Sequence, residues 1–461
     1  MNLVAGIDSS TQSTKVVVCD ADTGTVLREG RAPHPDGTVA DPEDWRQALT
    51  TASDGLLDDV AAIGIAAQQH GMVALDEHGV PVRPALLWND NRSAQAAIDL
   101  TEELGGPQAC AEAIGSVLVA SFTASKLRWL AEHEPDLADR VTDVLLPHDW
   151  LTWRLTGEFV TDRGDASGTG YWSPREGRYR EDVLATAFGG RKPRTPRVLG
   201  PAEAAGHTPD GKLVSAGTGD NMGAALGLDV RPGDVVVSLG TSGTVFARAE
   251  RPSADPSGQI AGFADATGGF LPLVCTLNAA RVLTATAAML GVGMAEFDEL
   301  ARRAEPGAGG LALLPYLDGE RTPLLPDAAG TLTGLRRDNM TPENLARAAV
   351  EGMLCGLAAG VDALRAEDIE VGRVLLIGGA AQSRAVQVVA PLIFGVPVTV
   401  PAPAEYVARG AARQAAWALA GTPDPPEWQL PGATELDVTD PAAGARIRDQ
   451  HTDAFTQVHR T

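Results

Sequence analysis

Short apolar runs separated by polar turns open the chain. Residues 3–7 and 16–19 are apolar and flank the polar segment 8–15, and a third apolar run covers residues 25–27. Runs of this length with polar or glycine-containing connections predict consecutive antiparallel strands.

A helix and two further strands are expected next. Asp41 can cap a helix that begins with a proline, because apolar residues then recur at helical spacing. Residues 60–67 and 85–88 are predicted to be buried strands, and each is followed by a polar segment, 68–71 and 89–92. Ligands of open α/β sheets bind at strand ends, so these polar segments are candidate binding residues.

The opening pattern recurs in the second half of the chain. Residues 233–239 and 244–247 are predicted strands joined by the glycine-bounded turn 240–243. A shift of 230 positions places Ser238, Gly240, Thr241, Gly243 and Thr244 on Asp8, Ser10, Thr11, Ser13 and Thr14. We therefore predict two homologous α/β domains, residues 1–229 and 230–461.

Helices and strands alternate through the rest of the second half. The predicted elements are strands at 374–377 and 396–400 and helices at 342–364, 384–394 and 405–420. After Gly421 the composition shifts to proline and aspartate, which predicts a loosely packed tail.

Composition and charge narrow the class of protein. The 461 residues are 44% hydrophobic and 21% charged, which is typical of a globular chain with two or three domains. A net charge of −23 opposes non-specific adhesion to nucleic acid or anionic lipid, so neither is an expected partner. The four cysteines are far apart and are expected to be buried free thiols. The chain shows neither a signal-like N-terminus nor an apolar run long enough to cross a bilayer, so a cytoplasmic location is expected.

The familiar nucleotide-binding motifs are missing. The sequence contains no P-loop, no protein-kinase catalytic loop and no dinucleotide-binding fingerprint, and its eight histidines show no metal-ligand spacing. A bound phosphate would therefore depend on backbone N–H groups, a metal ion or a few placed cations.

The first polar turn is one candidate for such a site. Residues 8–15 place a carboxylate, five hydroxyls and a lysine on one hairpin, where Asp8 could hold Mg²⁺ directly or through water. An ordinary polar hairpin has the same composition, and the turn 240–243 allows the same two interpretations. Two such turns at equivalent places could hold one nucleotide from both domains.

A single carboxylate that is preceded by two glycines follows another predicted strand. Gly217, Gly219 and Asp220 come after the strand 212–215 and precede a helix that starts near residue 222. Asp220 could simply cap that helix. The alternative is a base that a substrate hydroxyl can approach closely, and a weak base suits phosphoryl transfer, in which orientation matters more than deprotonation.

Amides, an imidazole and an indole gather at the two polar strand ends. The segments 68–71 and 88–92 contain groups that suit a polyhydroxylated sugar, because hydroxyls need donors and acceptors together. Packing roles for His70 and Trp88 remain the alternative.

In this order, the segments resemble the FGGY family of carbohydrate kinases in the actin-like ATPase superfamily, and most closely its xylulose-phosphorylating members. Residues 8–15 look like the first phosphate-binding loop of the family, with Ser10 in place of a glycine. Residues 217–221 look like the catalytic loop and residues 238–243 like the second phosphate loop.

Three further segments extend the likeness to nearly the whole chain. Residues 378–383 look like the adenosine loop, with Ala380 where a third glycine is common. Gln69 stands where relatives often carry methionine before the histidine. Residues 318–323 are similar to a loop of the same members that often begins with serine, where this chain has Asp318.

The resemblance implies two ribonuclease-H-like domains, with the sugar bound by the first and ATP by the second, and MgATP-dependent phosphorylation of D-xylulose at O5. Asp220 and Asp8 would be the catalytic residues and would hold the metal. The implied substrate-binding residues are Gln69, His70, Trp88, Asn89, Asp90, Asp220 and Asn221. The implied nucleotide-binding residues are Ser10, Thr11, Lys15, Gly240, Thr241, Ser242, Gly378, Gly379, Ala380 and Ser383.

Other functions are compatible with the same pattern. A kinase of the family could act on another ketose or a polyol, such as ribulose or glycerol, since one misplaced hydroxyl decides specificity. A nucleotide-driven sugar-binding regulator is the non-enzymatic alternative, although no added partner-binding module is evident in the sequence. Relatives also suggest a homodimer.

Overall fold

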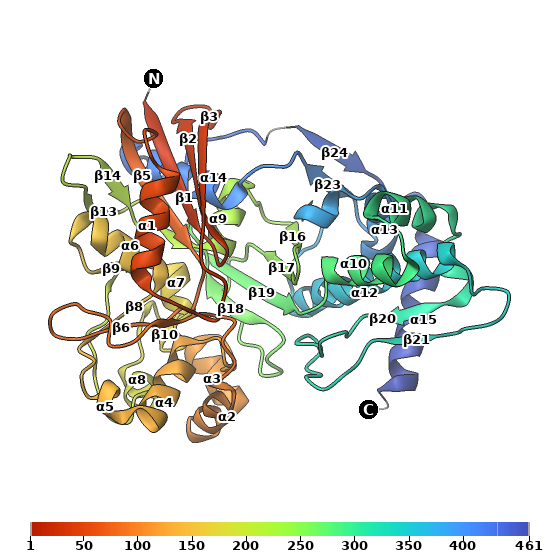
Figure 1. The fold of residues 1–461 in the computed structure, drawn as a ribbon, viewed down its shortest axis with the longest axis horizontal. Coiled ribbons are helices and arrows are strands. Elements are labelled where there is room, and N and C mark those ends of the chain that lie inside the picture. Colours follow the sequence, from red (N-terminus) through yellow and green to blue (C-terminus); the bar gives the residue numbers. More distant parts are fainter. Residues whose placement is uncertain (1, 431, 460–461) are drawn as a thin grey trace. The chain divides into compact units, whose positions relative to one another are not determined.

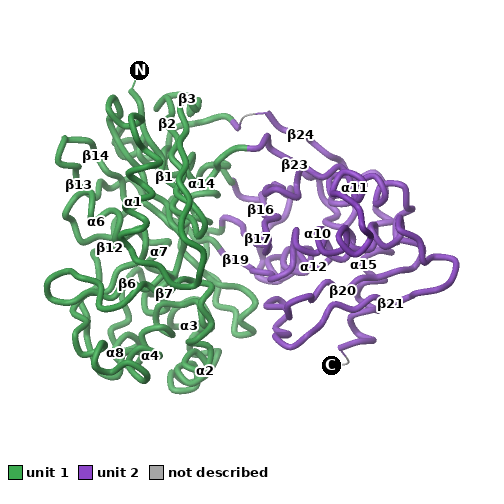
Figure 2. The backbone as a smooth tube through the Cα atoms, in the orientation of Figure 1, with its two compact units in different colours: residues 1–230, 249–271, 404–429 green, residues 231–248, 272–403, 430–461 purple. Residues whose placement is uncertain are grey.

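The computed structural model describes residues 2–430 and 432–459, which form two compact units. Unit 1 contains residues 1–230, 249–271 and 404–429, and unit 2 contains residues 231–248, 272–403 and 430–461 (Figures 1 and 2). Our expectation of two contiguous domains differs from this division. A helix near the C-terminal end of the chain packs within the first unit, because its small-residue face fits against the sheet there.

Unit 1 contains a mixed main sheet and several two-stranded sheets. Its strands are β1 (Leu3–Ser9), β2 (Ser13–Asp20), β3 (Val26–Pro33), β4 (Val39–Ala40), β5 (Val60–Ala67), β6 (Val73–Leu75), β7 (Ala85–Leu86), β8 (Asp143–Leu145), β9 (Val160–Asp162), β10 (Trp172–Ser173), β11 (Arg178–Tyr179), β12 (Arg197–Leu199), β13 (Ala204–His207), β14 (Leu213–Ser215), β15 (Thr218–Gly219) and β18 (Ala261–Ala264). Its helices are α1 (Pro42–Ala52), α2 (Ala94–Glu103), α3 (Pro107–Ile114), α4 (Thr123–His133), α5 (Pro135–Ala138), α6 (Pro147–Thr156), α7 (Arg163–Ser167), α8 (Glu181–Ala187), α9 (Asp220–Gly227) and α14 (Tyr406–Ala420).

The main sheet of unit 1 has the strand order β13-β14-β5-β1-β2-β3, with β15 also paired to β5. β1, β2 and β3 are antiparallel neighbours, as predicted, whereas β5 and β14 run parallel to β1 and to each other. Asp8 lies opposite Lys15 on one side and Ala66 on the other, and Ala66 also pairs with Thr218. The register therefore brings the first polar turn and the segment that leads into Asp220 to the same end of the parallel strands.

The two faces of this sheet are covered by different helices (Figure 1). Alternation along the strands directs Ile7, Ile63 and Ile65 toward α1 and α6, where Trp45 is buried. The opposite face carries smaller residues, including Val4 and Ala62, against α14. A helix can approach this second face closely because alanines and glycines line the contact.

Unit 2 repeats the hairpin and parallel-strand plan. Its strands are β16 (Asp234–Leu239), β17 (Gly243–Ala247), β19 (Phe270–Thr276), β20 (Ala312–Leu314), β21 (Thr331–Thr333), β22 (Arg373–Ile377), β23 (Val398–Pro401) and β24 (Ala433–Leu436). Its helices are α10 (Ala280–Leu290), α11 (Met294–Arg303), η1 (Ala308–Gly310), α12 (Pro342–Ala366), η2 (Gly379–Gln382), α13 (Arg384–Phe394) and α15 (Pro441–Val458). The strand order β19-β17-β16-β22-β23-β24 puts the parallel strand β22 beside the hairpin, as β5 stands beside β1.

The predicted repeat is confirmed up to the turn and then shifts by one residue. Asp8 pairs with Lys15 in the first hairpin, whereas Ser238 pairs with Thr244 in the second. The shift of 230 therefore becomes 229 after the turn, because the turn of unit 1 is one residue longer. Thr244 therefore corresponds to Lys15, and not to Thr14 as the alignment from the sequence suggested.

One expectation about the fold is met only in part and another is wrong. Residues 85–88 were expected to form a buried strand, and the strand β7 is buried, but it is two residues long and pairs with β4 in a separate two-stranded sheet. The segment after Gly421 was expected to be a loose tail, but it contains β24, which extends the sheet of unit 2, and the long helix α15. Trp428 of this segment is 2% exposed.

All four cysteines are free thiols, as predicted, and Cys275 is only partly buried. Within the described ranges, no helix combines the length and apolar character that a membrane span requires.

Candidate active site

The turn of the first hairpin in unit 1 holds a buried carboxylate beside a lysine. Asp8 is 1% exposed, and its Oδ2 lies 3.5 Å from Lys15 Nζ, which is 2.7 Å from Glu405 Oε2. Ser10 donates a short hydrogen bond to Asp8, so the serine that replaces a glycine orients this carboxylate. Burial raises the pKa of Asp8 against the opposing effect of Lys15. An added cation would relieve the cost of keeping this group charged.

Asp220, the carboxylate that follows the two glycines, begins a helix rather than capping it. Gly219 is the N-cap of α9 and Asp220 is its first residue, so the capping interpretation of Asp220 is wrong. One carboxylate oxygen of Asp220 accepts hydrogen bonds from Asn221, from the backbone N at 2.7 Å and from Nδ2 at 2.9 Å. Burial and, secondarily, the charge of Asp8 raise the pKa of Asp220 to about 7.

A glutamine from the far end of the chain holds the loop before Asp220. Gln414 of α14 is buried and binds both backbone groups of Gly217: Oε1 accepts from the N–H at 2.8 Å and Nε2 donates to the carbonyl at 2.9 Å. Sequence analysis missed this residue. A glutamine in a predicted amphipathic helix, 197 positions away from its partner, carries no local signal.

His70 is held by its ring and by its backbone. It has a positive φ of 67°, unusual for a residue other than glycine, at the point where β5 ends. Its ring packs against Phe122 and Phe263, with centroids 5.0 and 5.6 Å away, and its Nδ1 lies 2.6 Å from the carbonyl oxygen of Gly168. Both aromatic neighbours were missed in the sequence, since nothing local to them indicates a binding site.

The amides next to His70 include several unsatisfied polar atoms. Gln69 accepts a long hydrogen bond of 3.4 Å from Asn221 Nδ2, which brings two of the predicted substrate residues together. Both amide atoms of Gln68 and Nε2 of Gln69 are buried without a hydrogen-bond partner among the described residues. Leaving such atoms unpaired costs about 1–3 kcal/mol each. They mark a place where a polar ligand would be stabilised, and Gln68 joins the candidate residues.

The side chains of the second polar segment, residues 88–92, have different hydrogen-bond partners. The indole Nε1–H of Trp88 donates to Thr11 Oγ1 at 2.8 Å, so this partly exposed ring lies beside the first turn and is not a core residue. Asp90 accepts hydrogen bonds on both oxygens from Arg92 and Thr38, and its role in substrate binding stays a prediction. Asn89 donates weakly to a backbone carbonyl, at 3.4 Å.

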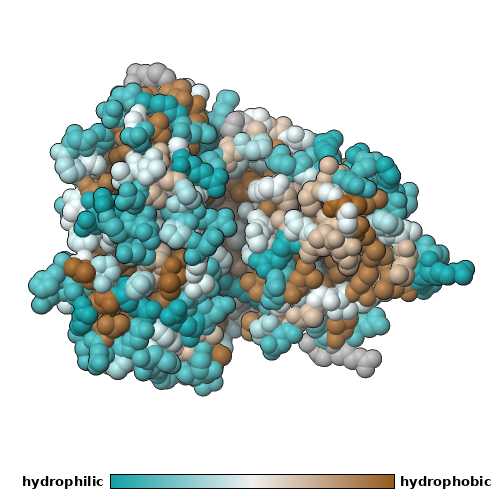
Figure 3. All heavy atoms as spheres, viewed as in Figure 1, coloured by the Kyte–Doolittle hydropathy of each residue, from teal (hydrophilic) through white to brown (hydrophobic). Residues whose placement is uncertain are grey.

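Unit 2 contains a cavity of about 720 Å³ at the end of its parallel strands. Its wall brings together several predicted nucleotide-binding residues: Gly240, Thr241, Gly379, Ala380 and Ser383. Ser242 and Gly378 are not part of the wall. The hydroxyl of Ser383 donates to Asp298 at 2.5 Å and accepts from the N–H of Val386, so its main contribution is to cap α13. Around α10 and α11 the surface of this unit includes exposed apolar side chains such as Met289 and Met294 (Figure 3).

An arginine beside this cavity was also missed. Arg281, the second residue of α10, donates to the carbonyl of Thr241 at 3.3 Å and pairs with Asp318 at 2.5 Å. It thus connects the second turn to the loop 318–323. In that loop Glu320 is 3% exposed and accepts hydrogen bonds from Leu277 and Asn278.

The fold and these sites define a kinase of the actin-like ATPase type, with a repeated hairpin and parallel-strand unit. The model of the FGGY carbohydrate kinase N-terminal domain matches residues 3–227, and that of the C-terminal domain matches residues 235–419. The chain therefore belongs to the FGGY family of carbohydrate kinases, which implies that it transfers a phosphoryl group from ATP to a sugar.

Several proteins that are similar to this chain over most of its length are xylulose kinases. Xylulose kinase of Streptomyces rubiginosus is 49% identical over 436 residues, covering 91% of this chain and 88% of the relative. Xylulose kinase of Escherichia coli is 36% identical and covers 82% of each chain. Among solved structures, xylulose kinase from Bifidobacterium adolescentis has a TM-score of 0.90 at 43% identity and covers 98% of this chain and 99% of its own.

Proposed function

We propose that this chain phosphorylates D-xylulose at its terminal O5, giving D-xylulose 5-phosphate and ADP. The observation that carries the proposal is the pairing of two carboxylates in unit 1. Asp220 begins α9 at a sheet edge that also holds Asp8, and burial raises its pKa to about 7. A carboxylate poised near neutrality suits a general base. The high identity to xylulose kinases supports xylulose as the acceptor.

Asp220 would orient the sugar hydroxyl and accept its proton as the phosphoryl group is transferred. The unpaired amide atoms of Gln68 and Gln69 and the held ring of His70 would bind the other sugar hydroxyls. In unit 2 the cavity beside Gly240 and Ala380 would hold the nucleotide. Positioning of this kind supplies much of the rate enhancement in phosphoryl transfer.

The residues of unit 1 fit a bound Mg²⁺. Asp8 and Asp220 offer hard oxygen ligands, and their charges repel each other enough that Asp8 helps to raise the pKa of Asp220. A divalent cation held by these two residues would remove that repulsion. When bound, the ion would neutralise charge on the transferred phosphoryl group.

We also propose that the enzyme works in the cytoplasm. All four cysteines are free thiols, which suits a reducing compartment. Fractionation of the native host cell would test this location directly.

The proposal is tested by ADP release with a panel of pentuloses, hexuloses and polyols at matched concentrations. We expect kcat/KM for D-xylulose to exceed that for ribulose and glycerol by at least about 100-fold, since a site built for particular hydroxyls rejects analogues that misplace them. NMR of the product should place the phosphate on O5. Activity confined to a polyol or to another ketose would replace xylulose as the substrate, and sugar binding without turnover would favour a regulator.

The pH dependence of the reaction gives an independent check on Asp220. A base must be ionised, so kcat/KM for the sugar should rise with pH and level off above the pKa of Asp220, which burial raises to about 7 and a bound Mg²⁺ would lower, so that the plateau begins at or below pH ~7. The terminal phosphate of ATP titrates in a nearby range, so the pH profile of kcat/KM for the nucleotide is needed as a control. A sugar profile that is flat from about pH 5 upward would contradict a base with this raised pKa.

A further inference from the structure

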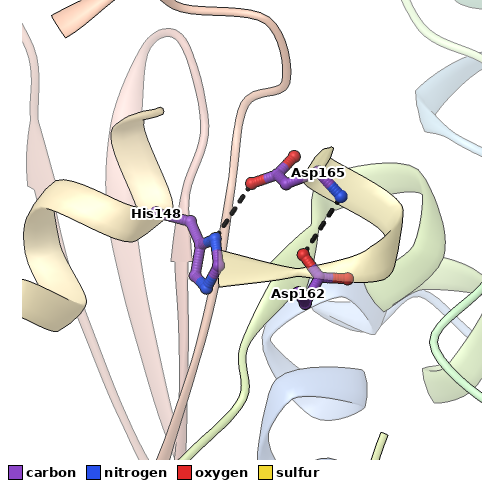
Figure 4. A group of neighbouring side chains, drawn as sticks. All are labelled: His148, Asp162 and Asp165. Carbon is purple, nitrogen blue, oxygen red and sulfur yellow. Dashed lines mark hydrogen bonds and ion pairs between the residues drawn. The ribbon is translucent and has the colours of Figure 1, made fainter. Parts of the chain in front are cut away.

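Three buried side chains beneath the catalytic loop form a charged cluster that the sequence did not indicate. His148 comes from α6, Asp162 ends β9 and Asp165 belongs to α7 (Figure 4). One ligand-type atom of each lies within 4.8 Å of the others, and all three residues are buried. The histidines show no metal-ligand spacing along the sequence, but the fold brings His148 close to two aspartates.

Hydrogen bonds within the protein account for this cluster better than a metal ion does. The oxygens of Asp162 accept from the backbone N–H groups of Gly164 at 2.7 Å and Asp165 at 3.0 Å, and so cap α7. His148 Nε2 lies 2.9 Å from the carbonyl oxygen of Ala216. A carbonyl can only accept, so this nitrogen carries a hydrogen and is not available to a metal.

The other ring nitrogen of His148 faces carboxylates. Nδ1 is 3.0 Å from Asp165 Oδ2 and 3.0 Å from Asp149 Oδ1. Burial alone would lower the pKa of His148, but the hydrogen bonds to these two aspartates raise it well above its usual value. Nε2 therefore carries a hydrogen that it directs at the loop, and Nδ1 shares a proton with the carboxyl group of Asp165, whose own pKa is raised by burial.

The loop before Asp220 lies directly on this cluster. A Cβ added to Gly217 would be 2.1 Å from His148 Nε2, and one added to Gly219 would be 2.9 Å from Asp165 Oδ1. Gly217 also has a φ of 78°, which other residues rarely adopt. Gln414 binds both backbone groups of Gly217. The loop is thus fixed at Ala216 and at Gly217, within four residues of Asp220.

We propose that His148 is a positioning residue for Asp220. Asp162 caps α7 and so places Asp165, Asp165 orients the imidazole ring of His148, and the Nε2–H of that ring fixes the Ala216 carbonyl at the start of the loop. The backbone from Ala216 to Gly219 then sets where the Asp220 carboxylate lies. This inference rests on the proposed role of Asp220 and does not depend on which sugar is the acceptor.

Two replacements of His148 distinguish the roles of its two ring nitrogens. The amide nitrogen of glutamine can replace Nε2, whereas asparagine reaches only the position of Nδ1. Both remove the same titratable ring and leave a neutral amide, so His148→Gln and His148→Asn are matched controls for each other. We expect His148→Asn to lower kcat by about 100-fold, the effect of a misplacement near 1 Å, with little change in KM for ATP. His148→Gln should stay within about threefold of the wild type, because it keeps the bond to Ala216.

A double-mutant cycle tests whether the effect passes through Asp220. In an Asp220→Asn background, His148→Asn should lower the residual activity further by less than about threefold, since the residue that it positions is already disabled. A full 100-fold loss in that background would show that His148 acts on something else. Equal kcat values for the glutamine and asparagine variants would also overturn the proposal.

Loss of the buried ring removes the partner of Asp165 and could unfold the single variants, so the same comparison is also designed in a second background. Asp165→Asn removes one carboxylate, and its amide oxygen can still accept a hydrogen bond. His148→Gln and His148→Asn are then compared within that background, with circular dichroism to verify folding. Activity is measured on whichever acceptor the wild type phosphorylates. If no acceptor in the panel is phosphorylated, the proposed function fails, while ATP hydrolysis without sugar still reports on the loop and decides the role of His148.

Discussion

Replacing Asp220 by asparagine is expected to lower kcat by about 10²- to 10⁴-fold, the contribution typical of a positioned general base. The variant should remain folded, because its amide oxygen can still accept the hydrogen bonds that Asn221 donates to the carboxylate. Binding of ATP should be close to normal, since the cavity proposed to hold the nucleotide lies within unit 2 and Asp220 lies in unit 1. ADP release measures kcat, and calorimetry measures nucleotide affinity.

The matched control for this prediction is Asp54→Asn. Asp54 is exposed, so its replacement removes the same formal charge without touching the site. We expect its kcat to equal that of the wild type. Turnover within tenfold of the wild type in a folded Asp220→Asn protein would remove Asp220 from the role of base, and a large loss in both variants would point to a general effect of charge.

Much of the candidate site could be predicted from the sequence because its chemistry is local. Asp8 and Asp220 each stand in a short segment whose turn residues indicate a strand end, and the structure brings both to one edge of the sheet. The two hairpins were likewise visible as short apolar runs around polar turns. Periodicity identifies such elements well, since it depends only on neighbouring residues.

The supporting residues could not be predicted, because their partners are far away in the chain. Gln414 binds Gly217 across 197 positions, and His148 binds Ala216 across 68. Neither residue type indicates a catalytic role by itself. Asp90 shows the same limit: its segment suggested a sugar ligand, but the sequence did not indicate that Arg92 donates to both of its oxygens. Which groups a carboxylate meets is decided by tertiary packing, and a single sequence does not contain that information directly.

The segment after Gly421 was misjudged for a related reason. Its prolines and aspartates indicate turns, but composition says nothing about the surface on which a turn packs. Trp428 is buried against the sheet of unit 1, and its Nε1–H donates to the carbonyl of Ala21 at 3.1 Å. One large aromatic side chain is enough to fix such a segment, since it buries more apolar area than most residues.

The close packing of α14 on α9 leads to the second large prediction, for Gly410→Ala. A Cβ added to Gly410 would lie 1.8 Å from the carbonyl oxygen of Gly223 and 2.8 Å from the backbone N of Gly227. Backbone atoms of a packed helix cannot move aside cheaply, so we expect a loss of about 3 kcal/mol in the free energy of unfolding, at the upper end for overpacking. Since α9 begins at Asp220, kcat should fall as well.

Gly356→Ala in α12 provides the matched control for this substitution. Gly356 also lies inside a helix, but a Cβ there would meet nothing within 4 Å. Alanine should therefore stabilise the protein by about 0.4–1 kcal/mol through its helix propensity and a less flexible unfolded chain. Urea unfolding of both variants measures the two changes. Opposite signs would show that close approach of the two backbones, and not helix propensity, requires glycine at position 410. A Gly410→Ala protein as stable as the wild type would show that α14 can move away from α9, and the catalytic loop would then be held less rigidly than its contacts indicate.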